Sequence, residues 1–99
     1  MPTPERTSTE EIVAAGREIL EIAGPSGLTM QAVADRVCIR APSLYRRVRD
    51  RYALHAAVAT ASIDALTARL DAAGDDIGAL AHAYRGFAQE HPEGFRLMF

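Results

Sequence analysis

The sequence predicts an all-α protein in which a three-helix, homeodomain-like helix-turn-helix unit is followed by further helices. Apolar residues recur at the helical period in every segment, and no segment alternates apolar and polar residues as a strand does. In addition, two short helical patterns joined by about three residues follow one longer pattern. That order of lengths is the layout of a helix-turn-helix motif.

The first helix is expected over about residues 8–23. Residues 7–9 offer N-caps, and Ser8 with Glu11 has the spacing of a capping box. The segment 24–27, Gly-Pro-Ser-Gly, should end this helix, because two glycines and a proline disfavour its continuation. The residues of the stripe that it would bury are Ile12, Ala15, Gly16, Ile19, Leu20 and Ala23.

The two short helices are expected over about residues 30–37 and 41–48. Thr29 is a good N-cap for the first of them. Pro42 suits the first turn of the second, where a backbone N–H has no intrahelical partner. The inward residues of the first would be Met30, Val33, Ala34 and Val37.

The rest of the chain is expected to form longer helices. One runs over residues 51–73 and is stopped by Gly74, and either Asp75 or Asp76 caps the next. Tyr84 and Phe87 of that helix are expected in the core rather than in a ligand pocket. The segment 91–94 should close it, and residues 95–99 begin a further apolar stretch.

Positive charge is concentrated in one segment of a mildly acidic chain. Residues 36–51 hold six arginines and one aspartate, a balance of +5, whereas the remainder has −7 and the whole chain −2. A compact basic segment on an acidic body is typical of a polyanion-binding site. The alternative is that these arginines simply lie on a solvated helix.

Within the third helix, the side chains separate by direction. Leu44 and Val48 lie on the face that should pack inward, with Ala41 beside them, and the small and basic residues lie opposite. Small residues would let the helix approach base edges, while guanidinium groups reach phosphates or guanine.

These residues resemble a known family. The stretch LTMQAVADRVCIRAPSLYRRVRDRYAL, residues 28–54, resembles the N-terminal DNA-binding segment of the tetracycline-repressor (TetR) family. The resemblance covers roughly residues 8–58, and a weaker one covers residues 83–99. Cys38 stands where the family prefers glycine, and we expect a small buried side chain there rather than a redox or metal site. The positions that match the family pattern are Thr29, Ala34, Ile39, Leu44, Tyr45 and Arg51.

The resemblance implies a role for each position that it carries over. Thr29 and the Tyr45 hydroxyl would contact phosphate, and Arg51 would clamp a phosphate at the start of the fourth helix. Tyr45 could instead pack in the core beside Leu44. The implied DNA-binding residues are Thr29, Arg40, Ala41, Pro42, Ser43, Tyr45, Arg46, Arg47 and Arg51.

The same resemblance implies the wider organisation. Residues 1–50 would be a DNA-binding domain, and residues 51–99 a linker helix and the opening of a C-terminal regulatory domain. The function expected is that of a ligand-responsive repressor, a homodimer on a palindromic operator in double-stranded DNA. A small-molecule inducer would bind mostly outside these 99 residues, and most of the dimer interface would lie there too. Without that interface, this chain should bind DNA weakly and as a monomer.

Other classes are disfavoured. No nucleophile-base-orienter set or phosphate-binding glycine loop is present, so neither an enzyme nor a cofactor is expected. The three histidines lack the spacing of metal ligands. No signal peptide or membrane span is apparent, and one cysteine suits a reducing compartment, so a cytoplasmic location is expected. The rival interpretation is a small helical protein-interaction module that uses the apolar end and the acidic surface.

Overall fold

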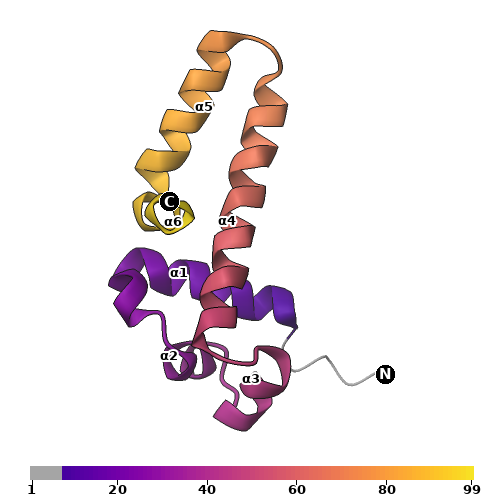
Figure 1. Cartoon of the computed structure of the whole chain (residues 1–99), viewed down its shortest axis with the longest axis vertical. Helices are drawn as coiled ribbons and strands as arrows, with labels where there is room; N and C mark the ends of the chain where they lie inside the picture. Colours follow the sequence, from indigo (N-terminus) through magenta and orange to yellow (C-terminus); the bar gives the residue numbers. More distant parts are fainter. Residues whose placement is uncertain (1–7) are drawn as a thin grey trace.

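The computed structural model describes residues 8–99, which form six helices (Figure 1). No strand occurs in this range, so the all-α prediction is confirmed. Residues 1–7, which include the N-cap candidate Thr7 and the start of the predicted 1–50 domain, lie outside the described residues. The helices are α1 (Thr9–Gly27), α2 (Met30–Arg36), α3 (Ala41–Arg47), α4 (Arg51–Ala73), α5 (Ile77–Glu90) and α6 (Pro92–Met98).

The two ends of α1 follow the local sequence. Ser8 is the N-cap, and its Oγ accepts a hydrogen bond from the Glu11 N–H at 3.1 Å. Gly24 has φ 74° and ψ 178°, a conformation that favours glycine and breaks the regular helix. Residues 25–27 therefore form a separate turn within α1, and the regular part ends where the sequence predicts.

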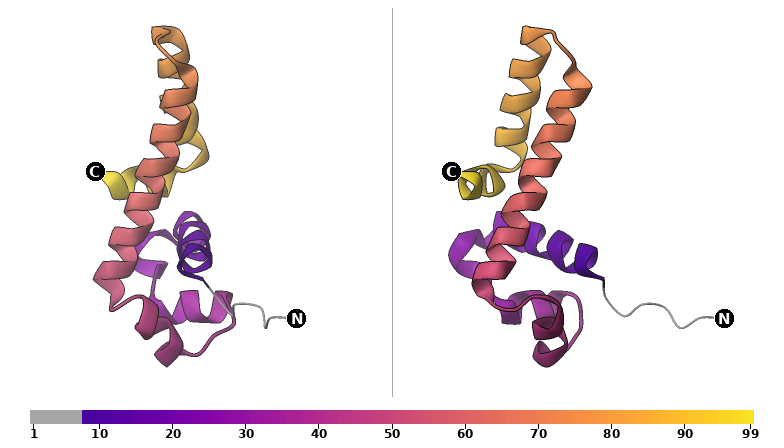
Figure 2. Two further views of the ribbon diagram at one scale, coloured as in Figure 1. Left: turned by 90° about the vertical axis from the view of Figure 1, so that its right-hand side faces the viewer. Right: turned by 45° about the vertical axis from the view of Figure 1, so that its right-hand side comes forward.

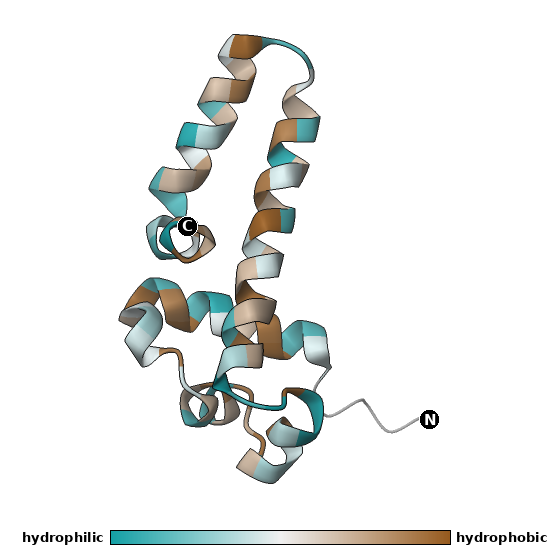
Figure 3. Cartoon of the chain, in the orientation of Figure 1, coloured by the Kyte–Doolittle hydropathy of each residue, from teal (hydrophilic) through white to brown (hydrophobic). Residues whose placement is uncertain are grey.

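The core lies where the first three helices meet the lower half of α4. Figure 3 shows hydrophobic residues gathered where α4 crosses α1. The predicted stripe of α1 is confirmed except at Ala23, which is exposed beside the break at Gly24. The residues of this core with no exposed surface are Ile12, Leu20, Leu28, Val33, Ala34, Leu44, Leu54 and Val58.

A glycine allows α1 and α4 to cross closely. A Cβ atom at Gly16 would lie 2.7 Å from Cγ2 of Val58, closer than packed carbon atoms approach. Since Val58 is fully buried and its χ1 is restricted in a helix, its methyl group has little freedom to move aside. Gly16 therefore belongs to the inward stripe because it lacks a side chain.

Helices α4 and α5 form an antiparallel pair that extends away from the first three helices (Figures 1 and 2). Asp50 caps α4, and its Oδ1 accepts from the Ala53 N–H at 2.8 Å. Gly74, with φ 71°, ends α4. Of the two candidate caps for α5, the structure has Asp76, whose Oδ1 accepts from the Gly78 N–H at 3.0 Å.

The chain ends in α6, which packs against α1, α4 and α5. The segment predicted to close α5 does more than that, because Pro92 already starts α6 in a position where a missing N–H costs nothing. The first turn of α6 is capped from α1: the Glu21 carboxylate accepts from the Glu93 N–H at 3.0 Å and from the Gly94 N–H at 2.9 Å.

The core prediction for α5 is right at Phe87 and wrong at Tyr84. Phe87 has no exposed surface, whereas Tyr84 is 41% exposed. The Tyr84 ring meets Phe95 of α6 edge-on, with the ring centroids 5.3 Å apart. The contact with Phe95 therefore leaves a large part of Tyr84 exposed.

The resulting molecule is elongated. Its principal extents are 46 × 37 × 19 Å, and the Cα radius of gyration is 15.3 Å. A compact chain of this length would have a radius of about 13 Å. None of the helices in residues 8–99 is long and apolar enough to cross a membrane.

Candidate nucleic-acid interface

The turn between α2 and α3 is a helix C-cap with a left-handed residue. Cys38 has φ 59°, and its N–H donates to Asp35 O at 3.3 Å while the Ile39 N–H donates to Ala34 O at 3.0 Å. This pair of bonds is the Schellman pattern, in which the residue after the C-cap is usually glycine. Ile39 packs against the core, as the accompanying hydrophobic contact of the motif requires.

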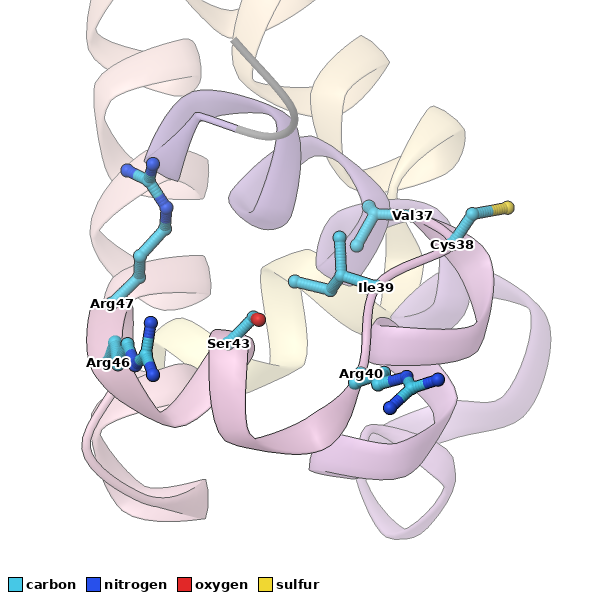
Figure 4. A pocket seen from close by; sticks show the side chains of 7 residues that line it. All are labelled: Val37, Cys38, Ile39, Arg40, Ser43, Arg46 and Arg47. Atoms are coloured by element: carbon cyan, nitrogen blue, oxygen red, sulfur yellow. The ribbon is translucent and has the colours of Figure 1, made fainter.

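The expectation of a buried Cys38 is wrong, because the side chain is exposed. A left-handed residue turns its Cα–Cβ bond away from the helix that it ends, and the sulfur points outward from the turn (Figure 4). The turn nevertheless keeps the backbone conformation for which glycine is usually chosen. Cysteine therefore accepts this conformation at a cost in strain and does not distort the motif.

The two faces of α3 separate as the helical wheel predicts. Leu44 is fully buried and Val48 is 5% exposed, so both belong to the core, and α3 lies against α2. Ala41 is half-buried. Tyr45 is 50% exposed and does not belong to the core. The other residues of the predicted site on this helix are exposed: Pro42, Ser43, Arg46 and Arg47.

A shallow concavity of about 870 Å³ lies along α3 and the preceding turn (Figure 4). Arg40 stands at one end of it, Arg46 and Arg47 at the other, and Ser43 between them. None of the side chains that line it is acidic. Its lining residues are Val37, Cys38, Ile39, Arg40, Ser43, Arg46 and Arg47.

The arginines of the basic segment have different environments. Arg36 pairs with Glu18 of α1, and Arg49 lies 3.9 Å from its neighbour Asp50. Arg40 and Arg46 make no ion pair or hydrogen bond with any residue in 8–99. Two guanidinium groups thus remain available at the concavity for an anion in solution.

Five of the nine predicted site residues do not line the concavity: Ala41, Pro42 and Tyr45 belong to α3, and Thr29 and Arg51 lie on other parts of the fold. Thr29 is the N-cap of α2, and its Oγ1 accepts from the Ala32 N–H at 3.1 Å. Arg51 begins α4, and its Nη2 donates to Pro25 O at 3.2 Å and to Ser26 O at 3.1 Å. The structure therefore brings Arg40, Ser43, Arg46 and Arg47 together at the concavity. Thr29 instead caps α2, and Arg51 binds backbone carbonyl groups at the end of α1.

Sequence reasoning missed the partners of Arg51 in the fold. His55, one turn further along α4, lies 2.8 Å from Leu28 O through Nε2. The available signal was the spacing of Arg51 and His55, which places both on one helix face. That spacing does not reveal which carbonyl groups they meet. No group of three His, Cys, Asp or Glu residues within the described part is placed to hold a metal ion.

The fold and this site define a helical protein with a helix-turn-helix motif, in which the second helix of the motif, α3, is basic and exposed. No family model matches the chain. Two curated proteins are similar to it, and both are named uncharacterized HTH-type transcriptional regulators. Rv0681 of Mycobacterium tuberculosis is 33% identical over 95 residues, which span 90% of this chain and 44% of that protein.

The second relative, YobS of Bacillus subtilis, is 32% identical over 90 residues, spanning 82% of this chain and 46% of that protein. The chain therefore matches less than half the length of either relative. In both cases the match covers most of this chain.

Proposed function

We infer that the chain is a DNA-binding transcriptional regulator that inserts α3 into the major groove of double-stranded DNA. The observation that carries this is the acid-free concavity along α3, with Arg40 and Arg46 unpaired within residues 8–99. Guanidinium groups on an exposed helix can contact phosphates or the O6 and N7 atoms of guanine. The names of the two relatives support the same class.

The proposed contacts follow the positions on the motif. Ala41, Pro42 and Ser43 form the N-terminal part of α3, where small side chains allow close approach to base edges. Arg40, Arg46 and Arg47 surround it and would bind bases or phosphates, while the exposed Tyr45 hydroxyl and the N-terminus of α2 at Thr29 would bind phosphate.

We also propose a family, a division into domains and a mode of regulation. We place the chain in the TetR family on the residues of segment 28–54, with residues 1–50 as the DNA-binding domain and 51–99 as the linker helix and the first part of a regulatory domain. In this scheme the regulator is a cytoplasmic homodimer that represses transcription from a palindromic operator. A small-molecule inducer releases it.

A salt titration of DNA binding tests the proposal. The association constant should fall linearly with salt on logarithmic axes, by about 0.9 for each phosphate contacted. Arg46→Ala should either lower that slope by about 0.9 or, if Arg46 reads a base, cost roughly 1–3 kcal/mol and relax the sequence preference. Arg85→Ala, on the distant α5, is the matched control and should leave binding unchanged.

One set of results would contradict the assignment of α3 as the recognition helix. If Tyr45→Phe, Arg46→Ala and Arg47→Ala all bind DNA as the unaltered protein does, α3 is not the recognition helix. The alternative is then a protein-interaction module, which the aromatic cluster of the half-buried Phe95 with the exposed Tyr84 and Phe99 favours. Binding to such a partner would depend only weakly on salt.

A further inference from the structure

The segment 25–29, which comprises the last turn of α1 and its connection to α2 and is called the α1–α2 loop below, takes part of its backbone hydrogen bonding from α4. Pro25 O accepts from the Leu28 N–H at 3.2 Å, and Gly27 O accepts from the Thr29 N–H at 3.1 Å. Within the described residues, Ser26 O is bonded only by Arg51 and Leu28 O only by His55. Since Leu28 has no exposed surface, water cannot readily replace the bond to its carbonyl.

The two donors come from the first two turns of α4. The Arg51 Nη2 reaches both Pro25 O and Ser26 O, at 3.2 and 3.1 Å. His55 Nε2 is 2.8 Å from Leu28 O, a distance at which this nitrogen must carry the proton. The 3.5 Å approach of Arg51 Nε to the same nitrogen is then a contact between two donors and not a hydrogen bond.

The electrostatics of the loop favour this arrangement. The last carbonyl groups of a helix carry partial negative charge, and a cation near them is stabilising. The last turn of α1 contains no basic residue. Arg51 supplies the missing cation from another helix, and its Nη2 carries two N–H bonds, so this one nitrogen can donate to both carbonyl groups.

The loop leads directly into the DNA-facing part of the molecule. Leu28 is followed by Thr29, which caps α2, and α2 carries α3 through the Schellman turn. We propose that Arg51 and His55 are positioning residues that tie α4 to the α1–α2 loop and thereby hold the helix-turn-helix in its DNA-binding orientation. Arg51 then acts through the loop and does not clamp a phosphate. This inference rests on the proposed function.

The salt slope separates the two roles of Arg51. A positioning residue changes the fraction of molecules that are ready to bind, and the number of phosphates contacted in the complex stays the same. With a short mixed-sequence DNA duplex, we expect Arg51→Gln to weaken binding roughly 3- to 10-fold without changing the slope. Arg46→Gln should lower the slope if it contacts phosphate, and Arg85→Gln controls for the loss of one positive charge.

His55 provides a second, independent variant. His55→Ala should also weaken binding without changing the slope, although it removes no permanent charge. Because both residues hold one loop, the effects of His55→Ala and Arg51→Gln should not add in the double variant.

Amide hydrogen exchange tests the contacts of Arg51 and His55 with the α1–α2 loop in the absence of DNA. The Ala32 and Val33 amides donate to Oγ1 and O of Thr29, each at 3.1 Å, and report on the cap that follows the loop. Both amides should exchange faster in Arg51→Gln and His55→Ala, and at the normal rate in Arg46→Gln.

Three results would overturn the inference in different ways. A slope lowered by about 0.9 in Arg51→Gln, with unchanged exchange, would make Arg51 a phosphate contact. Unchanged affinity in both variants would remove the positioning role. If the unaltered protein shows no salt-dependent DNA binding, the proposed function fails, and the DNA part of this inference fails with it. Hydrogen exchange then still decides whether Arg51 and His55 stabilise the α1–α2 loop.

Discussion

Cys38 holds a backbone conformation that residues with a Cβ atom adopt at a cost. Its φ of 59° is in the left-handed region, and its side chain is exposed and contributes nothing to the core. The conformation is imposed by the two hydrogen bonds of the Schellman turn, which place Ile39 against the core. A residue that adopts this conformation at lower cost should therefore stabilise the protein.

We predict that Cys38→Gly stabilises the protein. Relief of left-handed strain is worth about 1–2 kcal/mol, and the greater freedom of glycine in the unfolded chain offsets about 0.5–1 kcal/mol of it. A net gain of about 0.5–1 kcal/mol should appear in urea unfolding. Cys38→Ala keeps the same backbone cost and should be close to neutral; equal stability of the two variants would contradict the assignment.

Arginines in one short segment also differ through their partners. Arg36 and Arg51 are engaged with other helices and loops, while Arg40 and Arg46 make no such contact within residues 8–99. Residue type and local charge do not distinguish these cases. The distinction depends on which groups the fold brings within reach of each guanidinium.

At the scale of elements, one ion pair closes the α4–α5 pair near α6. The Arg69 Nη1 lies 2.7 Å from Glu90 Oε2, and the Arg69 guanidinium also sits over the Phe87 ring, 5.5 Å from its centroid. The hydrogen bond from Arg69 lowers the pKa of Glu90 below its ordinary range, and the same bond raises the pKa of Arg69. Both side chains remain partly exposed, so solvent screens the pair.

This pair predicts a pH dependence. Because the Glu90 pKa is lower in the folded protein, its contribution is present above the ordinary glutamate pKa of about 4.3 and is lost as the pH falls further. Glu90→Gln should lower the melting temperature slightly at neutral pH. The difference between the two proteins should shrink when both are measured in increasingly acidic buffer.

The partner variant supplies the control for that experiment. Arg69→Gln should remove the same pH-dependent difference, and adding Glu90→Gln to it should change little further. If the melting temperature of Glu90→Gln follows that of the unaltered protein in parallel down to acidic pH, the ion pair contributes nothing.

At the scale of the whole molecule, the charge and the shape are both asymmetric. Six arginines and one aspartate lie in residues 36–51, which comprise the turn, α3 and the start of α4 at one end of the molecule, while the remainder is acidic. Figure 3 shows a hydrophilic run over the α3–α4 connection at this end. Such a distribution would orient the protein on a polyanion with its basic end first.

The extended α4–α5 pair predicts a distinctive radius of gyration. Small-angle X-ray scattering of a dilute solution should give a value close to 15.3 Å, with a small increment from hydration. A compact chain of this length would give about 13 Å. A value that low would mean that α5 and α6 fold back, and a rise with protein concentration would indicate association of copies.

Features determined by neighbouring residues could be predicted from the sequence alone. The caps at Ser8 and Thr29 each satisfy an N–H three residues away, and the inward placement of Leu44 and Val48 follows from the helical period. These interactions need no knowledge of how the helices pack.

Features that join distant residues were decided only by the tertiary structure. Arg51 meets carbonyl groups 25 and 26 residues away, and Glu21 caps a helix 72 residues further along. Exposure of Tyr84 likewise depends on how much of α5 the short α6 covers. The physical reason is common to all three. A side chain with several donors or acceptors satisfies whichever groups packing brings within hydrogen-bond distance, and the sequence specifies the donors but not their neighbours.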